Sequence, residues 1–140
     1  MIYLDTSAAV PLFVPEVATE RVLAWYASSA DALVSADWIL PEFASALSLK
    51  ERRGEITAEQ SQLVWSEFLA FSDNGLRLVP VNRKLFRDAA ARVLDAASGL
   101  RAGDSLHLAT AIEIGATGFA TTDATLAANA RKMGLPTIPF

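Results

Sequence analysis

Short apolar runs alternate along the chain with segments whose apolar residues recur at helical spacing. The apolar runs predict five strands, at residues 1–4, 32–35, 77–81, 118–121 and 136–140, of which the first is expected to be buried. The helical spacing predicts helices at residues 16–28, 38–53, 57–73, 82–98, 103–114 and 123–133. Strands that alternate with helices in this way are typical of a parallel sheet with helices on both faces.

Turn and capping residues set the expected boundaries of these elements. We expect Asp37 to cap the helix that follows it, with Pro41 in the first turn and Gly54 at the end. Residues 6–14 are expected to form a turn with a short helix. The strand at residues 136–140 is expected at an edge of the sheet, because its two prolines would harm a central strand.

The composition predicts one globular domain over residues 1–140 and excludes several classes of protein. Hydrophobic residues make up 52% of the chain and charged residues 20%, which excludes intrinsic disorder. The net charge of −4 excludes a uniformly basic coat, so a nucleic-acid site must be a local basic patch. The absence of cysteine excludes disulfide scaffolds, iron–sulfur clusters and thiol nucleophiles, and it fits a reducing compartment.

Motifs of several other enzyme classes are missing from the sequence. His107 is the single histidine, so a histidine-based metal site or a Ser-His-Asp triad would depend on it alone. There is no P-loop, dinucleotide-binding glycine motif or nucleophile elbow. The longest uncharged run, residues 6–15, is shorter than a membrane span, and no basic segment precedes Asp5 as in a signal peptide. We therefore expect a cytoplasmic protein without a membrane segment.

Two carboxylates follow predicted strands directly. Asp5 lies at the carboxyl end of the first strand, and Asp123 lies just past the carboxyl end of the fourth. Ligands of parallel sheets collect outside the carboxyl ends of the strands, so both positions fall where a site is expected. The alternative interpretation is that each aspartate only caps the helix that follows it.

Two further carboxylates lie in the first turns of predicted helices. Glu42 borders the apolar stripe of its helix, and its alternative role is to interact with the helix dipole. Asp104 shares a helix face with His107, Leu108 and Ala111. Its alternative role is that of an N-cap whose hydrogen bonding His107 satisfies.

Taken together, the four carboxylates favour a metal site. Crowded carboxylates repel one another, and protons or a cation must offset that repulsion. Oxygen-only ligand sets suit hard ions such as Mg²⁺ or Mn²⁺. Such ions bind phosphates, lower the pKa of bound water and stabilise in-line displacement. The chemistry indicated is metal-assisted hydrolysis of a phosphodiester.

Four segments also resemble, in order and spacing, the motifs of PIN-domain nucleases. These segments are Ile2–Ser7, Pro41–Phe43, Gly103–Ala111 and Phe119–Leu126. The third motif is the most specific, and the resemblance covers essentially the whole chain. The length and short form of the chain are similar to those of the VapC toxins of prokaryotic toxin–antitoxin pairs.

The resemblance implies a fold, an activity and a set of site residues. The fold would be a three-layer α/β/α arrangement with a parallel sheet of about five strands. The activity would be endonucleolytic cleavage of RNA, leaving a 5′-phosphate and a 3′-hydroxyl. Asp5, Glu42, Asp104 and Asp123 would be catalytic and would bind one or two Mg²⁺ or Mn²⁺ ions. Whether Asp123 binds metal directly or through water stays open.

The resemblance also implies supporting residues and partners. Thr6 and Thr121 match positions that support the site by hydrogen bonds. The protein would form homodimers, and heterotetramers or larger assemblies with a VapB-type antitoxin. The C-terminal arm of that antitoxin would lie across the toxin and occlude the acidic pocket, often with a basic side chain.

RNA binding by an acidic protein requires local cations in addition to metal. Arg101, three residues before Asp104, is the best candidate for a phosphate contact. The basic groups at residues 50–53 and 83–87 have alternative roles at a helix end or on a solvated helix face. His107 is expected to be structural or to support the site, because it has no acidic or histidine partner within its own helix.

Three other functions are alternatives to this hypothesis. Phosphatases that form an aspartyl-phosphate need a second aspartate where Ser7 stands. A receiver domain needs its phospho-accepting aspartate after the third strand, where the sequence has Val81 and Asn82. The remaining alternative is an inactive PIN-like module that binds RNA or a protein. Such a module would tolerate EDTA and the substitutions Asp5→Asn and Asp104→Asn, whereas a nuclease would not.

Overall fold

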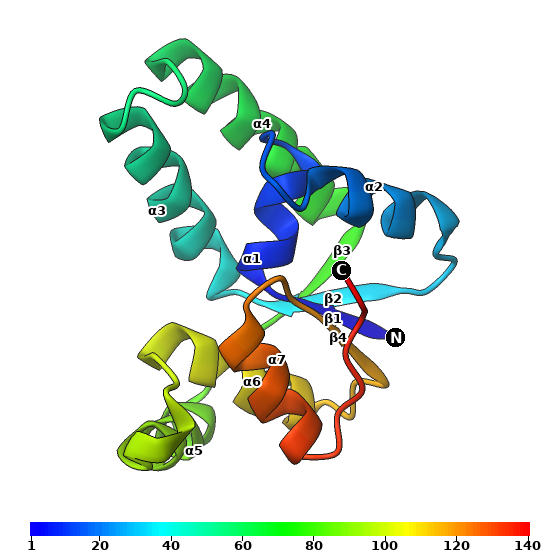
Figure 1. Ribbon diagram of the computed structural model, residues 1–140, viewed down its shortest axis with the longest axis vertical. Coiled ribbons are helices and arrows are strands. Elements are labelled where there is room, and N and C mark those ends of the chain that lie inside the picture. The colour runs from blue at the N-terminus through cyan, green and yellow to red at the C-terminus, as the bar shows by residue number, and fades with distance from the viewer.

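The computed structural model describes all 140 residues, and its centre is a four-stranded parallel sheet (Figure 1). The strands are β1 (Ile2–Leu4), β2 (Leu33–Ala36), β3 (Leu76–Val79) and β4 (Gly118–Ala120), in the order β3-β2-β1-β4. In the register of the sheet, Ile2 pairs with Leu33 on one side and with Gly118 on the other. The central position of β1 places Asp5, the residue that follows it, between the ends of its neighbours.

Helices cover both faces of this sheet. They are α1 (Thr6–Ala9), α2 (Thr19–Ser28), α3 (Ile39–Arg52), α4 (Ala58–Asn74), α5 (Arg83–Leu94), α6 (Ala102–Glu113) and α7 (Ala124–Lys132), with short 3-10 helices η1 (Val10–Leu12) and η2 (Ala96–Ser98). Helices α1 to α4 lie on one side of the sheet and α5 to α7 on the other (Figure 1). The predicted three-layer α/β/α class is confirmed. No helix combines the length and apolar character needed to cross a membrane.

Each face of the sheet has its own apolar core, because alternate residues of a strand point to opposite faces. Ile2 and Leu4 join the core beneath α1, α3 and α4, where the rings of Phe43 and Phe68 stack with centroids 3.8 Å apart. Tyr3 joins the opposite core, and its ring stacks on Phe119 at 5.3 Å. Strand β1 is therefore anchored on both sides, and this fixes the direction in which the chain leaves it.

Residues 136–140, expected as a fifth strand, contribute a single bridge at the edge. Phe119 N–H donates to the carbonyl of Pro136 at 2.8 Å, and Ile138 N–H donates to the carbonyl of Phe119 at 2.9 Å. The one resulting bridge is parallel and joins Phe119 to Thr137. The two prolines of this segment lack an N–H, so no longer ladder forms and the sheet keeps four strands.

Several element boundaries differ from the prediction by a few residues. The expectation that Asp37 caps α3 is wrong, because the N-cap position is Trp38 and no side chain caps this helix. Helix α2 begins at Thr19, since the Thr19 hydroxyl accepts from the backbone N–H of Glu16 and holds the preceding turn. Helix α5 ends at Leu94, and η2 closes at Gly99, whose φ of +65° is left-handed.

Candidate metal centre

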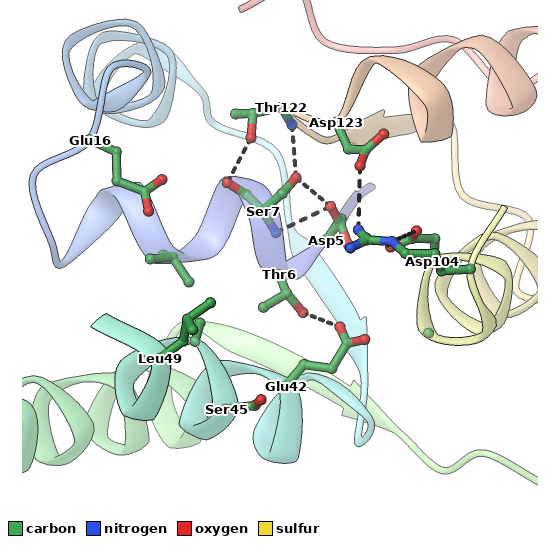
Figure 2. A pocket seen from close by; sticks show the side chains of 14 residues that line it. Asp5, Thr6, Ser7, Glu16, Glu42, Ser45, Leu49, Asp104, Thr122 and Asp123 are labelled. Carbon is green, nitrogen blue, oxygen red and sulfur yellow. Dashed lines mark hydrogen bonds and ion pairs between the residues drawn. The ribbon is translucent and has the colours of Figure 1, made fainter. Parts of the chain in front are cut away.

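The four predicted carboxylates line one open cavity of about 600 Å³ (Figure 2). Asp5 enters it from the end of β1, Glu42 from the first turn of α3, Asp104 from the first turn of α6, and Asp123 from the residue before α7. Segments far apart in sequence thus meet at the carboxyl end of the sheet, as the topology requires.

Asp5 is the most deeply held of the four. Its side chain caps α1, with Oδ2 accepting from the backbone N–H of Ser7 at 3.2 Å and from its hydroxyl at 2.5 Å. The hydroxyl of Thr121 donates to the same oxygen at 2.9 Å. Burial raises the pKa of the Asp5 carboxyl, and the charge of His107 and these hydrogen bonds oppose that shift only in part. A nearby cation would favour the charged form.

Glu42 is held from below by two hydrogen bonds to one oxygen. The hydroxyl of Thr6 donates to Oε2 at 2.6 Å, and Nε2 of His107 lies 2.7 Å from the same atom. Burial raises the pKa of Glu42, but the hydrogen bond and charge of His107 and the bond from Thr6 outweigh it, so the net shift is downward. Glu42 is therefore a carboxylate near neutral pH.

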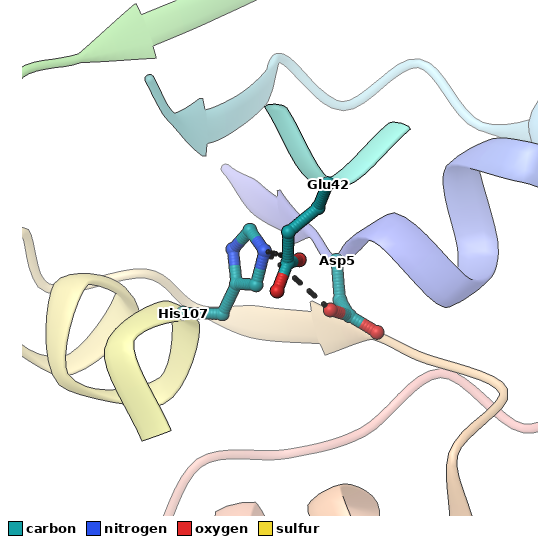
Figure 3. A group of neighbouring side chains, drawn as sticks. All are labelled: Asp5, Glu42 and His107. Atoms are coloured by element: carbon teal, nitrogen blue, oxygen red, sulfur yellow. Dashed lines mark hydrogen bonds and ion pairs between the residues drawn. The ribbon is translucent and has the colours of Figure 1, made fainter. Parts of the chain in front are cut away.

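His107 is fully buried and joins the site from α6, next to Glu42 and Asp5 (Figure 3). Besides Glu42, its ring contacts the hydroxyl of Thr6 at 3.1 Å and that of Tyr3 at 2.8 Å. The alternative role of Asp104 as an N-cap satisfied by His107 is wrong, because the N-cap position is Arg101 and the hydrogen-bond partners of His107 come from β1, α1 and α3. Burial lowers the pKa of His107, but the hydrogen bond to Glu42 and the nearby carboxylate charges give a net upward shift.

Asp104 and Asp123 share a cationic neighbour. Arg101 Nε donates to Asp104 Oδ2 at 2.8 Å, and a second guanidinium nitrogen lies 3.5 Å from Asp123 Oδ2. Asp123 also caps α7, since its Oδ1 accepts from the backbone N–H of Leu126 at 2.9 Å. Asp5 and Asp123 therefore have both of the roles expected from the sequence, since each caps a helix with one oxygen and also lines the cavity.

Ser7 was missed as a site residue, although it lies within the first motif. Its hydroxyl accepts from the backbone N–H of Thr122 at 3.0 Å, and its carbonyl accepts from the Thr122 hydroxyl at 2.9 Å (Figure 2). These bonds join α1 to the loop after β4, and both residues line the cavity. Their role could have been inferred from the sequence, because Ser7 lies two residues after Asp5 and Thr122 directly precedes Asp123.

Gly103 is a second residue whose role the sequence did not reveal. A Cβ built on this glycine would overlap Oε1 of Glu42. A bare Cα at this position therefore allows α6 to pack against the Glu42 carboxylate. The signals in the sequence were its position directly before Asp104 and at the start of the third motif.

The other basic residues considered from the sequence do not line the cavity. Lys50 is paired with Glu16 at 2.6 Å, and Lys84 with Glu113 at 2.6 Å. The three tryptophans pack, partly buried, against the apolar cores: Trp25, Trp38 and Trp65. Among the cations singled out from sequence, Arg101 alone lines the acidic cavity.

The donor set fits a hard divalent cation. Four carboxylates face one cavity, and ligand atoms of Asp5, Glu42 and His107 all lie within 4.8 Å of one another. Carboxylate oxygens are the ligands that Mg²⁺ and Mn²⁺ favour. His107 does not line the cavity, and both of its ring nitrogens already have partners. The carboxylates are therefore the groups available to a metal ion.

Comparison with known families gives one clear match. The sequence model of the PIN domain family matches residues 2–132. A comparison with curated proteins found no match for the sequence.

Solved structures show the same fold at low sequence identity. The sarcin–ricin loop cleaving toxin VapC20 of Mycobacterium tuberculosis has a TM-score of 0.74 at 17% identity, covering 92% of this chain and 95% of that one. FitAcB of Neisseria gonorrhoeae has a TM-score of 0.69 at 17% identity, covering 99% and 97%. VapBC2 of Rickettsia felis, bound to a DNA fragment from its promoter, has a TM-score of 0.66 at 18% identity, covering 100% and 99%.

Proposed function

The chain belongs to the PIN domain family, and from this premise we propose that it is a metal-dependent endoribonuclease toxin of the VapC type. The observation that carries the proposal is the convergence of Asp5, Glu42, Asp104 and Asp123 on one cavity. Four carboxylates from four separate segments are costly to place together unless a cation offsets their repulsion. A structural role at helix ends would not require them to share a cavity.

The proposed metal is Mg²⁺ or Mn²⁺, held by some or all of the four carboxylates. When bound, such an ion lowers the pKa of water and stabilises charge on the phosphate oxygens during in-line displacement. Ser7 and Thr121 hold Oδ2 of Asp5, and Thr6 holds Oε2 of Glu42. These hydroxyls fix the carboxylates in place before the ion arrives, which lowers the cost of organising the site.

The proposed substrate is single-stranded or looped RNA. The cavity is open to solvent on one side, so a phosphodiester in a flexible strand can reach the carboxylates. Arg101, with 77% of its side chain exposed at the rim, would contact a substrate phosphate. VapC20, which shares this fold, carries the description of a toxin that cleaves the sarcin–ricin loop. That likeness supports RNA as the substrate class.

We further propose that the protein inhibits growth and that a VapB-type antitoxin neutralises it. Structural relatives include toxin–antitoxin complexes, two of them bound to DNA. The acidic cavity already attracts one guanidinium, Arg101, and a basic side chain from an antitoxin arm would find the same carboxylates. We propose a homodimer for the free toxin, and a heterotetramer or larger assembly with the antitoxin.

Cleavage of labelled RNA tests this function. The wild-type protein with millimolar Mn²⁺ should produce discrete fragments with 5′-phosphate ends, and EDTA should stop the reaction. Asp5→Asn and Asp104→Asn should abolish cleavage, while Asp73→Asn, at an exposed carboxylate near the end of α4, should not change it. Cleavage that persists in EDTA or in Asp104→Asn would contradict the proposal. Absence of any cleavage or metal binding would favour the inactive binding module.

A further inference from the structure

A buried chain of hydrogen bonds connects the centre of the sheet to Glu42. The backbone N–H of Ala36 in β2 donates to the hydroxyl of Tyr3 in β1 at 3.0 Å. The Tyr3 hydroxyl lies 2.8 Å from Nδ1 of His107. Nε2 of His107 lies 2.7 Å from Oε2 of Glu42 (Figure 3). Tyr3 and His107 have no solvent exposure. Of the side chains in this series of hydrogen bonds, only Glu42 is therefore exposed to water.

The chemistry of the partners assigns the hydrogen on each ring nitrogen. A carboxylate only accepts hydrogen bonds, so the contact with Glu42 requires a hydrogen on Nε2. The Ala36 N–H occupies a lone pair of the Tyr3 hydroxyl, which leaves the hydroxyl hydrogen to donate to Nδ1. The neutral imidazole with hydrogen on Nε2 thus gives each of these three hydrogen bonds one donor and one acceptor.

The same contacts argue against His107 as a direct metal ligand. Its side chain is 0% exposed, while that of Glu42 is 26% exposed and lines the cavity. Nε2 would have to lose its hydrogen and its bond to Glu42 in order to coordinate an ion. Glu42 would therefore be the residue that holds an ion in the cavity, and His107 contacts Glu42 from the buried side.

We propose that His107 is a positioning residue, which holds the Glu42 carboxylate at the cavity wall by donation from Nε2. Tyr3 fixes the ring by donating to Nδ1, and the sheet fixes Tyr3 through Ala36. This role rests on the proposed metal-dependent function. It adds that metal affinity depends on a side chain which never contacts the metal. Hydrogen-bond partners of metal ligands typically change affinity by about 10- to 100-fold when removed.

The ring hydrogens can be observed directly, because His107 is the only histidine in the chain. In ¹⁵N-labelled protein at alkaline pH, Nε2 should carry the hydrogen and Nδ1 should not. Saturation with diamagnetic Mg²⁺ should leave the hydrogen on Nε2, and Tyr3→Phe should shift the Nδ1 resonance. Hydrogen on Nδ1 in the neutral ring, or loss of the Nε2 hydrogen on adding Mg²⁺, would overturn the proposal.

Two amide substitutions of His107 distinguish the roles of its two ring nitrogens. Gln at position 107 places an amide near the site of Nε2, whereas Asn places one near Nδ1. By calorimetric titration with Mn²⁺, His107→Gln should stay within about threefold of the wild type, and His107→Asn should lose about tenfold or more. Equal affinities in both variants would overturn the role of Nε2. A wild-type protein that bound no Mn²⁺ would overturn the proposed function and this role with it.

Discussion

Arg101, at the N-cap position of α6, contacts Asp104 in the first turn of the same helix, with 2.8 Å between Nε of the arginine and Oδ2 of the aspartate. A second guanidinium nitrogen lies 3.3 Å from the other oxygen of the same carboxylate. The pair places a positive charge beside two of the carboxylates proposed to hold metal, since Asp123 is also in range at 3.5 Å. A metal ion bound by these carboxylates would therefore compete with the Arg101 guanidinium for the same oxygens.

The competition predicts a gain of metal affinity when the guanidinium is removed. Exposed ion pairs contribute at most about 1 kcal/mol, so Arg101→Ala should tighten Mn²⁺ binding by up to about fivefold. The same variant should bind RNA more weakly, because a phosphate contact is lost. Arg101→Lys, which keeps the charge, is the matched control. Calorimetry with Mn²⁺ measures the first effect, and weaker metal binding by Arg101→Ala would contradict it.

A methyl group at position 103 should damage the site without unfolding the protein. The Cβ of Gly103→Ala would overlap Oε1 of Glu42, so the carboxylate must move away from its place. Alanine favours a helix over glycine by about 1 kcal/mol, which partly offsets the clash in stability. We expect RNA cleavage to fall at least about tenfold while the midpoint of thermal unfolding changes little. Unchanged cleavage would show that Glu42 need not be held at this position.

The Glu42–His107 pair predicts a pH dependence of stability in the metal-free protein. The pKa of His107 is raised from 6.5, so its contribution is complete below that pH and is lost as pH rises through the folded value. The pKa of Glu42 is lowered from 4.5, so its contribution is present above that pH and is lost as pH falls through the folded value. The pair therefore contributes fully between pH 4.5 and 6.5.

Urea unfolding in EDTA across this range measures that contribution. The free energy of unfolding of the wild type, relative to Glu42→Gln, should be largest in this window and decline at alkaline pH. Asp5, whose pKa is raised, is present in both proteins, and the charge of Glu42 adds to that rise, so the comparison measures the pair together with its effect on Asp5. A difference that grew steadily from pH 6.5 to 9 would contradict the charge assignment.

Removal of the Ser7 hydroxyl should weaken both stability and metal binding. It donates to Asp5 and accepts from the backbone of Thr122, and its loss leaves that N–H without its partner. Such losses cost about 1–3 kcal/mol. Ser7→Ala should lower the free energy of urea unfolding by this amount, and Ser66→Ala, on the exposed side of α4, should lower it by less than about 0.5 kcal/mol. Equal effects of the two substitutions would contradict a role for Ser7 in holding the site.

The sequence predicted the fold class and the meeting of the acids because both depend on local signals. Apolar runs and capping residues specify strands that alternate with helices, and a parallel sheet then brings strand ends such as Asp5 and Asp123 together. Residues 136–140 gave a weaker signal, because apolar character predicts a strand but two prolines limit it to one bridge.

The motifs indicated Thr6 and Thr121 as supporting residues, but the contacts of His107 and Gly103 could not be predicted from local pattern. His107 has no acidic partner within its helix, and its contacts come from Tyr3 and Glu42, 104 and 65 positions away. The packing of Gly103 against Glu42 likewise depends on how α6 crosses α3, which no spacing in either segment specifies. Buried polar networks are assembled by tertiary structure, so their members look structural when each helix is considered alone.

Metal-dependent stabilisation tests most directly whether the four carboxylates act together. Thermal unfolding of the wild type, Asp104→Asn and the exposed control Asp73→Asn would be followed in EDTA and then in millimolar Mn²⁺. A site filled at about 100 times its dissociation constant stabilises the fold by about 2.7 kcal/mol. Wild type and Asp73→Asn should show a clear upward shift with Mn²⁺, and Asp104→Asn should show little or none. Equal shifts in all three proteins, or no shift in the wild type, would contradict a metal centre built from these residues.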